Sequence, residues 1–253
     1  MSSISIFIIS VKNSRNFDNL AESLVQSFGI SPTISWGVTP KELPCYETAP
    51  HLHEGKYRPL SCREVAAALS HSRAKELAFA EGKEWNIFLE DDSELIRSEN
   101  SEFIASLLKL PPEIPFFVHL FPEQNGILMS SQYPGMNSIR KIPDYANAYA
   151  VNAEGLKLFL KNTDRSHLYL ADWPRLSPRI KRIATSRSVF RHPFQSIDSS
   201  LISDERNLIQ TNSRAFAITY RIKQAVFRII RIPSAKFGAE YIANENLRSI
   251  KWL

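Results

Sequence analysis

Apolar and polar positions in the first ninety or so residues repeat with the two periods that distinguish strands from helices. Residues 4–11 and 33–38 predict strands, and the large apolar side chains of 85–89 suit a strand buried on both faces of a parallel sheet. Residues 17–28 carry apolar side chains at helical spacing, and Gly29 follows where a left-handed cap would end the helix. Strand, helix and strand in this order form a βαβ unit with parallel strands. The pattern therefore predicts an α/β fold.

A second helix is predicted directly before the strand at 85–89. Ser61 and Glu64 have the spacing of a capping box, which predicts a helix from Cys62 to about Glu81. His71 and Lys75 lie one turn apart, on the flank of its apolar face.

The pattern weakens after the first hundred residues. Residues 116–121 predict a strand that includes His119, for which a core position is favoured over a catalytic one. Residues 122–144 are rich in loop signals, 145–151 predict another strand, and 153–161 predict a helix capped by Asn152.

Three carboxylates follow the strand at 85–89: Glu90, Asp91 and Asp92. Ligands of open α/β sheets bind at this end of the strands, and adjacent negative charges favour a bound cation. A divalent metal that carries a phosphorylated substrate would explain the cluster, whereas acids that merely face solvent at a strand end are the simpler alternative. Strand geometry places Asp91 opposite to the other two acids unless the strand ends by Leu89.

Composition and charge describe an ordinary globular protein with a basic excess. The 253 residues carry a formal charge of +5, and the basic side chains concentrate in 175–191 and 214–236. Nucleic acid, an anionic membrane surface and phosphorylated sugars would all suit this distribution. Cys45 and Cys62 are too few for a disulfide framework, which favours reduced thiols and a cytoplasmic location. No apolar stretch approaches the length of a membrane span.

Residues 214–231 have the pattern of a basic amphipathic helix in the C-terminal tail. Such a helix can lie at a membrane surface or pack on its own protein.

Three segments of the sequence resemble successive blocks of glycosyltransferase family 25, which includes bacterial lipooligosaccharide galactosyl- and glucosyltransferases. They are residues 6–29, 63–71 and 87–92. The second ends in Leu-Ser-His and the third in Leu-Glu-Asp-Asp, at the family's spacing.

Weaker likenesses at residues 170–174 and 192–196 extend the resemblance to about residue 210. The sequence departs from the family at Ala66 and Ala67, where Gly-Cys is usual, and at Arg15, which stands in place of an arginine pair.

The resemblance implies a GT-A-like, Rossmann-type, mostly parallel sheet with flanking helices in residues 1–213. The nucleotide-sugar half would cover about 1–121 and the acceptor half about 122–213. Residues 214–253 would form the basic tail.

The implied activity is metal-dependent, inverting transfer of a hexose, with galactose expected, from a UDP-sugar to a lipooligosaccharide or lipopolysaccharide acceptor. Asp92 and Glu90 would bind Mn²⁺ or Mg²⁺, and Glu90 or Asp91 would contact the nucleotide. Asp172 is the candidate general base, and His71 is the other candidate for chemistry or phosphate contact.

Basic side chains would contact the diphosphate or the acceptor in such an enzyme. Arg15 and Arg179 are candidates for the nucleotide sugar; Arg179, like Lys181, Arg182 and Arg187, fits a phosphate contact or, more simply, a solvated surface charge. A lipid-anchored acceptor would bring the protein to the cytoplasmic face of the inner membrane, and no nucleic acid is expected.

Two other classes of function fit the same residues. A two-metal nuclease or phosphohydrolase would use the same acids and the basic tail. A non-catalytic sugar-binding module descended from a transferase would keep the fold without the general base.

Overall fold

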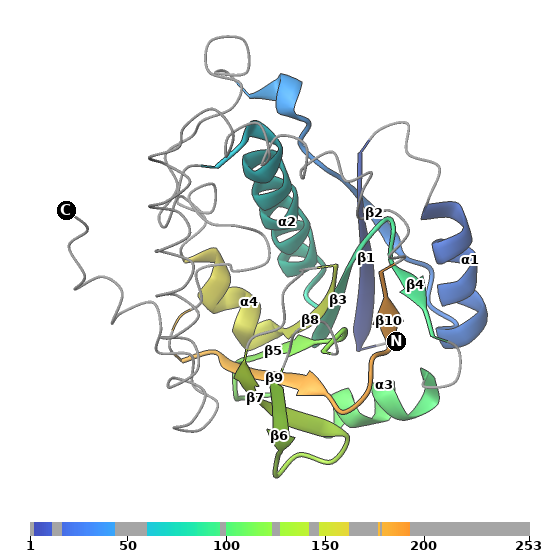
Figure 1. The fold of residues 1–253 in the computed structure, drawn as a ribbon, viewed down its shortest axis with the longest axis vertical. Helices are drawn as coiled ribbons and strands as arrows, with labels where there is room; N and C mark the ends of the chain where they lie inside the picture. Colours follow the sequence, from blue (N-terminus) through green and yellow to red (C-terminus); the bar gives the residue numbers. More distant parts are fainter. Residues whose placement is uncertain are drawn as a thin grey trace, which may run out of the picture.

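The computed structural model describes residues 3–11, 17–43, 60–96, 100–122, 127–141, 147–161, 177 and 179–192. These residues form an eight-stranded sheet in the order β2-β1-β3-β8-β5-β9-β7-β6, with helices on both faces (Figure 1). The predicted α/β class is therefore confirmed.

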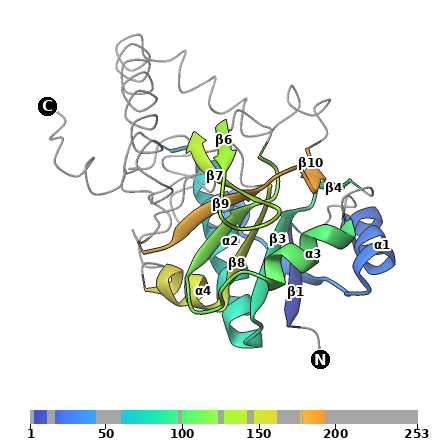
Figure 2. The same cartoon turned by 90° about the horizontal axis from the view of Figure 1, so that it is seen from below.

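The elements follow one another along the chain as β1 (Ile4–Ser10), α1 (Phe17–Phe28), β2 (Thr33–Trp36), η1 (Pro40–Glu42), α2 (Cys62–Glu81), β3 (Trp85–Glu90), β4 (Glu94–Leu95), α3 (Asn100–Leu108), β5 (Phe116–His119), β6 (Ile127–Ser130), β7 (Met136–Lys141), β8 (Ala148–Asn152), α4 (Ala153–Leu160), β9 (Lys181–Thr185) and β10 (Phe190–Arg191). Strands β4 and β10 pair antiparallel and form a small separate sheet beside the main one (Figure 2).

The first βαβ unit has the predicted form. Strand β1 pairs parallel with β2 and with β3, and α1 connects β1 to β2. Gly29 ends α1 at a φ of 66°, a left-handed conformation that glycine adopts without the steric cost of a Cβ.

Two strands of the main sheet run against the others. Strand β8 is antiparallel to both β3 and β5, and β7 is antiparallel to both β9 and β6. Since β5 and β9 are parallel, the remaining six strands share one direction. The mostly parallel sheet is confirmed, and the arrangement is consistent with a GT-A-like fold. The sheet twists strongly, so that β9 lies nearly across the direction of β1 (Figure 1).

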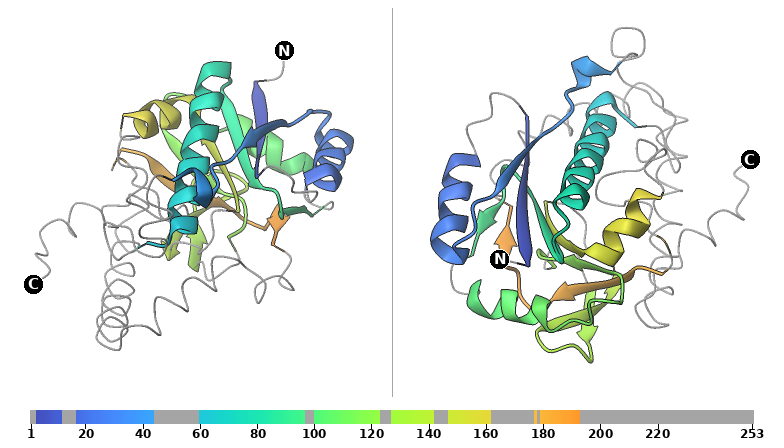
Figure 3. Two further views of the ribbon diagram at one scale, coloured as in Figure 1. Left: turned by 90° about the horizontal axis from the view of Figure 1, so that it is seen from above. Right: turned by 180° about the vertical axis from the view of Figure 1, so that it is seen from behind.

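Each face of the sheet packs on its own pair of helices (Figure 3). Phe7 and Phe88 on one face pack with Ala74 of α2 and Phe159 of α4. On the other face, the aliphatic side chains of β1 and β3 pack against α1 and α3. The stacked rings of Phe7 and Phe88, with centroids 5.5 Å apart, join the two strands on the α2 side.

Helix α2 begins and ends where the sequence predicts. The Ser61 hydroxyl accepts a hydrogen bond from the Glu64 N–H at 3.2 Å, and the Glu64 carboxylate accepts one from the Ser61 N–H at 3.0 Å. The predicted orientation of α2 needs a correction, because His71 and Lys75 are buried rather than on the flank of its apolar face. Phe79, near the end of the helix, is exposed. The alanines of α2 allow it to approach the sheet closely, and the arc facing the sheet includes both polar residues.

Burial of Lys75 carries a cost in stability. Its ammonium lies 4.6 Å from the ring centroid of Phe159 and 5.4 Å from that of Tyr149, and burial lowers its pKa from 10.5 to about 7. The unfolded chain therefore binds a proton more readily than the folded chain. This difference destabilises the fold fully below about pH 7 and disappears above about pH 10.5.

We expect Lys75→Met to raise the melting temperature by several degrees at pH 7, because the substitution removes a penalty on the order of a few kcal/mol. The gain should shrink as the pH approaches 10. Thermal unfolding of wild type and variant at both pH values measures it, with Lys109→Met, at an exposed lysine, as the control. An unchanged or lower melting temperature at pH 7 would contradict the expectation.

The region predicted as loop-rich contains an antiparallel hairpin, so that prediction is wrong. Strands β6 and β7 pair with each other, and β7 also pairs with β9. Met136 and Ile139 are buried at one edge of the main sheet. Strand β7 carries only two apolar residues, Met136 and Ile139, and its second partner, β9, lies forty-odd residues later in the sequence.

Helix α4 is capped as predicted. Asn152 Oδ1 accepts hydrogen bonds from the N–H groups of Gly155 at 3.0 Å and Phe116 at 2.9 Å, while its Nδ2 donates to the Ile114 carbonyl at 2.7 Å. The preceding strand begins at Ala148 rather than at residue 145. One side chain thus fixes the start of α4 relative to β5.

The predicted C-terminal helix and the proposed boundary near residue 213 lie outside the described residues. Within the described part of the chain, no helix combines the length and apolarity needed to cross a membrane.

Candidate active site

The acidic cluster follows the carboxyl end of β3, as expected. Glu90 is the last residue of the strand, and Asp91 and Asp92 form a turn closed by a hydrogen bond from the Ser93 N–H to the Glu90 carbonyl at 3.0 Å. Strand β3 therefore does not end by Leu89, the condition under which all three acids could face one metal. Because β1 ends beside β3, the cluster lies at the edge of the parallel part of the sheet.

Asp91 has hydrogen-bond partners at the end of β1. Its Oδ2 accepts a hydrogen bond from the Ser10 hydroxyl at 2.8 Å, and its N–H donates to the Ile9 carbonyl at 3.2 Å. Ser10 is the last residue of β1, so this contact connects the ends of the two parallel strands.

Glu90 extends toward α2. Its Oε1 lies 3.1 Å from His71 Nε2, and the other ring nitrogen of His71, Nδ1, lies 3.0 Å from the Tyr149 hydroxyl. His71 and Tyr149 are both buried, and their rings stack with centroids 5.7 Å apart. The three side chains thus form a continuous line from β8 through α2 to the end of β3.

The protonation of this line follows from the environment of Tyr149. Burial, followed by the charge of Glu90, raises the pKa of Tyr149 well above its ordinary value, so the phenol keeps its proton. A phenol that donates to Nδ1 leaves the proton of neutral His71 on Nε2, from which it can be donated to an ionised Glu90. The Tyr149 hydroxyl therefore influences which ring nitrogen of His71 carries the proton.

The surroundings of Glu90 disfavour the negative charge of its carboxylate. Burial raises its pKa to about 8, Asp92 and then Asp91 act in the same direction, and His192 opposes them. About a third of the side chain, 34%, remains exposed, so ligands can reach it. A group in this position favours a bound proton or a bound cation.

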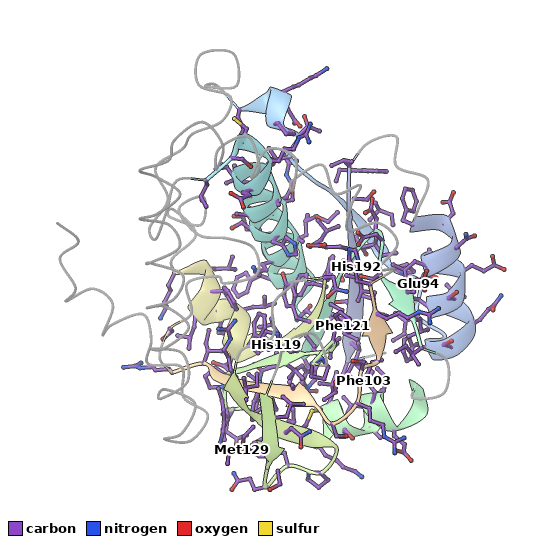
Figure 4. The ribbon with its side chains drawn as sticks, in the orientation of Figure 1. Glu94, Phe103, His119, Phe121, Met129 and His192 are labelled. Carbon is purple, nitrogen blue, oxygen red and sulfur yellow. The ribbon has the colours of Figure 1, made fainter. Side chains whose placement is uncertain are left out.

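Asp92 contacts His192, which is the last residue that the structure describes. Its Oδ2 lies 2.9 Å from His192 Nε2. His192 follows β10, and the pairing of Arg191 with Glu94 brings it back to the acidic turn. Figure 4 labels His192 and Glu94 near each other at this end of the structure. Asp92 Oδ1 is buried and has no hydrogen-bond partner among the described residues.

These residues fit a hard divalent cation in part. Among the residues that the structure describes, no three His, Cys, Asp or Glu side chains converge as a metal site. Glu90 and Asp92 remain as two carboxylates, and the partnerless Oδ1 of Asp92 is an oxygen donor of the right chemistry. Mg²⁺ and Mn²⁺ commonly take one or two carboxylates and complete their coordination with substrate phosphates and water.

The other predicted site residues are not brought to this cluster by the described structure. Arg15 and Asp172 lie outside the described residues. Arg179 is exposed and precedes β9, at the amino end of a strand that runs in the direction of β3. The acids follow the carboxyl end of β3, so Arg179 belongs to the opposite edge of the sheet.

Arg182 is buried, so the prediction of a solvated surface charge is wrong for this residue. It is 1% exposed, and its guanidinium carbon lies 5.1 Å from the ring centroid of Phe117 on the neighbouring strand β5. Lys181 donates to the Tyr133 hydroxyl at 3.1 Å. Arg187 is exposed, as predicted.

The sequence pattern assigned no role to Ser10 and His192, which contact the acids, or to Tyr149, which contacts His71. Ser10 is only a polar residue within the strand predicted over residues 4–11. His192 begins a segment that resembles the family, but nothing in the sequence pairs it with Asp92, a hundred residues earlier.

Comparisons with known proteins give a distant structural likeness. No protein-family model matches the chain. No curated protein matches it either. One similar solved structure is a glycosyltransferase involved in the glycosylation of the major capsid of PBCV-1, at 16% identity over 64% of this chain and 67% of that chain, with a TM-score of 0.35. Another is a mannose-1-phosphate geranyltransferase from Thermus thermophilus, at 11% identity over 75% and 76%, with a TM-score of 0.44. At these values neither likeness carries an argument about activity.

Proposed function

We propose that this protein is a metal-dependent, inverting glycosyltransferase that moves a hexose, galactose by the family resemblance, from a UDP-sugar to a lipooligosaccharide or lipopolysaccharide acceptor. The observation that carries the proposal is the position of Glu90 and Asp92. Two carboxylates stand at the end of β3, where open α/β sheets bind ligands, and one has a buried oxygen without a partner in the described structure.

The cation would be Mn²⁺ or Mg²⁺, bound by Asp92 and Glu90. When bound, it supplies positive charge that stabilises the diphosphate leaving group. Glu90 must lose any proton it carries before it binds the ion, and the ion replaces the repulsion between the two acids with attraction.

His71 and Tyr149 act as positioning residues in this proposal. His71 is 3% exposed and is occupied on both ring nitrogens, so its proposed role is to orient Glu90 rather than to contact the sugar. Asp91, fixed by Ser10 on the other side of the turn, is the proposed contact to the nucleotide.

The remaining roles rest on the sequence. Asp172, next to an aromatic side chain on which a sugar ring could stack, is the proposed general base. Arg15 is the proposed diphosphate contact; Arg179 is not proposed for this role, because it lies at the opposite edge of the sheet from the acids. The basic tail would bring the enzyme to the membrane surface that carries the lipid-anchored acceptor.

Calorimetry with UDP tests the donor and the metal together. We expect UDP to bind in the presence of Mn²⁺ and to lose at least about tenfold in affinity when the metal is removed with EDTA, because the diphosphate is then placed beside two uncompensated carboxylates. Glu94→Gln, two residues beyond the cluster, is the control variant. It should bind UDP with the same dependence on Mn²⁺ as wild type, because the partner of Glu94 is the exposed Arg191. Absence of UDP binding with Mn²⁺ present would refute the proposal.

The two alternative functions make different predictions in simple assays. A sugar-binding module would bind the UDP-sugar with Mn²⁺ but release no UDP. A two-metal nuclease would cleave DNA on addition of Mg²⁺.

A further inference from the structure

Asn147 lies directly opposite Glu90 across the antiparallel pair of β3 and β8. The last pair of the ladder is Leu89 with Ala148, and the Glu90 N–H continues it by donating to the Asn147 carbonyl at 2.8 Å. Residues directly opposite each other extend their side chains on the same face, with Cβ atoms about 5 Å apart. Tyr149, two residues further along, uses that face to reach His71. The Asn147 amide is therefore on the Glu90 side of the sheet.

The side-chain amide of Asn147 is buried without a polar partner in the described part of the chain. The residue is 1% exposed, and neither its Oδ1 nor its Nδ2 forms a hydrogen bond with another described residue. A buried polar group in this state costs roughly 1–3 kcal/mol. An apolar side chain would avoid the cost, so the amide is expected to bind something that these residues do not supply.

The backbone of Asn147 is fixed by the acidic turn. Its carbonyl accepts from the Glu90 N–H and also from the Ser93 hydroxyl, each at 2.8 Å. These two bonds come from the start and the end of the turn that includes Asp92. The turn therefore folds against Asn147, and it includes Asp92, whose Oδ1 is buried without a partner among the described residues.

We propose that Asn147 Oδ1 is the third protein ligand of the divalent cation, together with Asp92 and Glu90. This inference rests on the cation of the proposed function and deepens it. Hard cations accept amide oxygens beside carboxylates, and a neutral third ligand completes the set without adding another repelling charge. A site of two acids and one amide also agrees with the absence of a cluster of three His, Cys, Asp or Glu side chains in the described structure.

Binding of Mn²⁺ alone tests the assignment without reference to activity. Electron paramagnetic resonance of free Mn²⁺ gives the affinity of wild type and of Asn147→Ala, and we expect the variant to bind at least about tenfold more weakly. Asn137→Ala, which removes an amide from β7, is the matched control and should bind as wild type. Far-ultraviolet circular dichroism and thermal unfolding establish that each variant is folded.

A change of ligand type distinguishes coordination from a purely structural role. Asn147→Cys replaces a hard oxygen by a soft sulfur, so the affinity for Cd²⁺ relative to Mn²⁺ should rise at least about tenfold over wild type. This ratio also decides the matter if Asn147→Ala does not fold.

The outcomes separate the two proposals. If wild type binds Mn²⁺ while Asn147→Ala binds it equally well, or if the Cd²⁺ to Mn²⁺ ratio of Asn147→Cys is unchanged, Asn147 is not a ligand and the proposed function stands. If wild type binds no Mn²⁺ with or without UDP, the metal-dependent function itself is overturned.

Discussion

Replacement of Asp92 by Asn is expected to lower metal-dependent release of UDP from UDP-galactose by at least about 100-fold, the scale on which losing one electrostatic contact to a developing charge affects turnover. The substitution preserves the size of the side chain and removes one of the two negative charges that would bind the cation. It also removes the carboxylate that contacts His192 Nε2. The measurement is UDP release with Mn²⁺, repeated with UDP-glucose so that the result does not depend on one donor.

The control for this experiment changes a nearby carboxylate in the same way. Glu94→Gln breaks the exposed pair with Arg191 and should leave turnover within about twofold of wild type, since exposed ion pairs contribute little. A variant Asp92→Asn that is folded and retains wild-type turnover would remove Asp92 from the site. A wild-type protein that binds a UDP-sugar without releasing UDP would indicate the sugar-binding module instead.

Loss of the His71 ring is expected to have the second largest effect. In His71→Ala, Glu90 loses its buried hydrogen-bond donor, and residues of this supporting kind typically contribute about 10- to 100-fold to metal affinity or activity. Tyr149→Phe removes only the hydroxyl that fixes the tautomer of His71, so a smaller loss, about tenfold, is expected. Mn²⁺ affinity at a fixed pH and UDP release both report on the change.

Tyr133→Phe is the matched control for the tyrosine variant. The Tyr133 hydroxyl also takes part in a side-chain hydrogen bond, with Lys181, but at a distance along the sheet from the acids. We expect it to bind Mn²⁺ as wild type. If His71→Ala and Tyr149→Phe also bind Mn²⁺ and turn over as wild type, the line from Tyr149 to Glu90 has no role in positioning.

Elements with strong local signals follow the sequence closely. The capping box at Ser61 and Glu64 sets the start of α2, Gly29 ends α1, and Asn152 caps α4. In each case the residue satisfies a backbone group within a few positions of itself, so neighbouring sequence contains the whole interaction. The hairpin of β6 and β7 escaped prediction in part because β7 also pairs with β9, forty-odd residues later, and no local pattern records that contact.

The acids of the candidate site could be found from the sequence, but their partners could not. A run of carboxylates after an apolar strand is visible in a single sequence. The contacts from His71 to Glu90 and from His192 to Asp92 depend on which strands lie side by side. Arg182 shows the same limit, because a basic residue in a charged segment gives no sign that it packs on Phe117.

The sequence by itself determined the α/β class, the first βαβ unit, the limits of α1, α2 and α4, and the position of three acids at the end of a buried strand. Those features follow from hydrophobic period, capping chemistry and chain order, which act over short distances. Only the tertiary structure decided that Asp91 turns away to Ser10, that Tyr149 and His71 support Glu90, and that Asn147 lies opposite it. The first arrangement arises because β1 ends beside β3, and the others arise when β8 inserts antiparallel between β3 and β5. Strand order of this kind is set by the packing of the whole sheet.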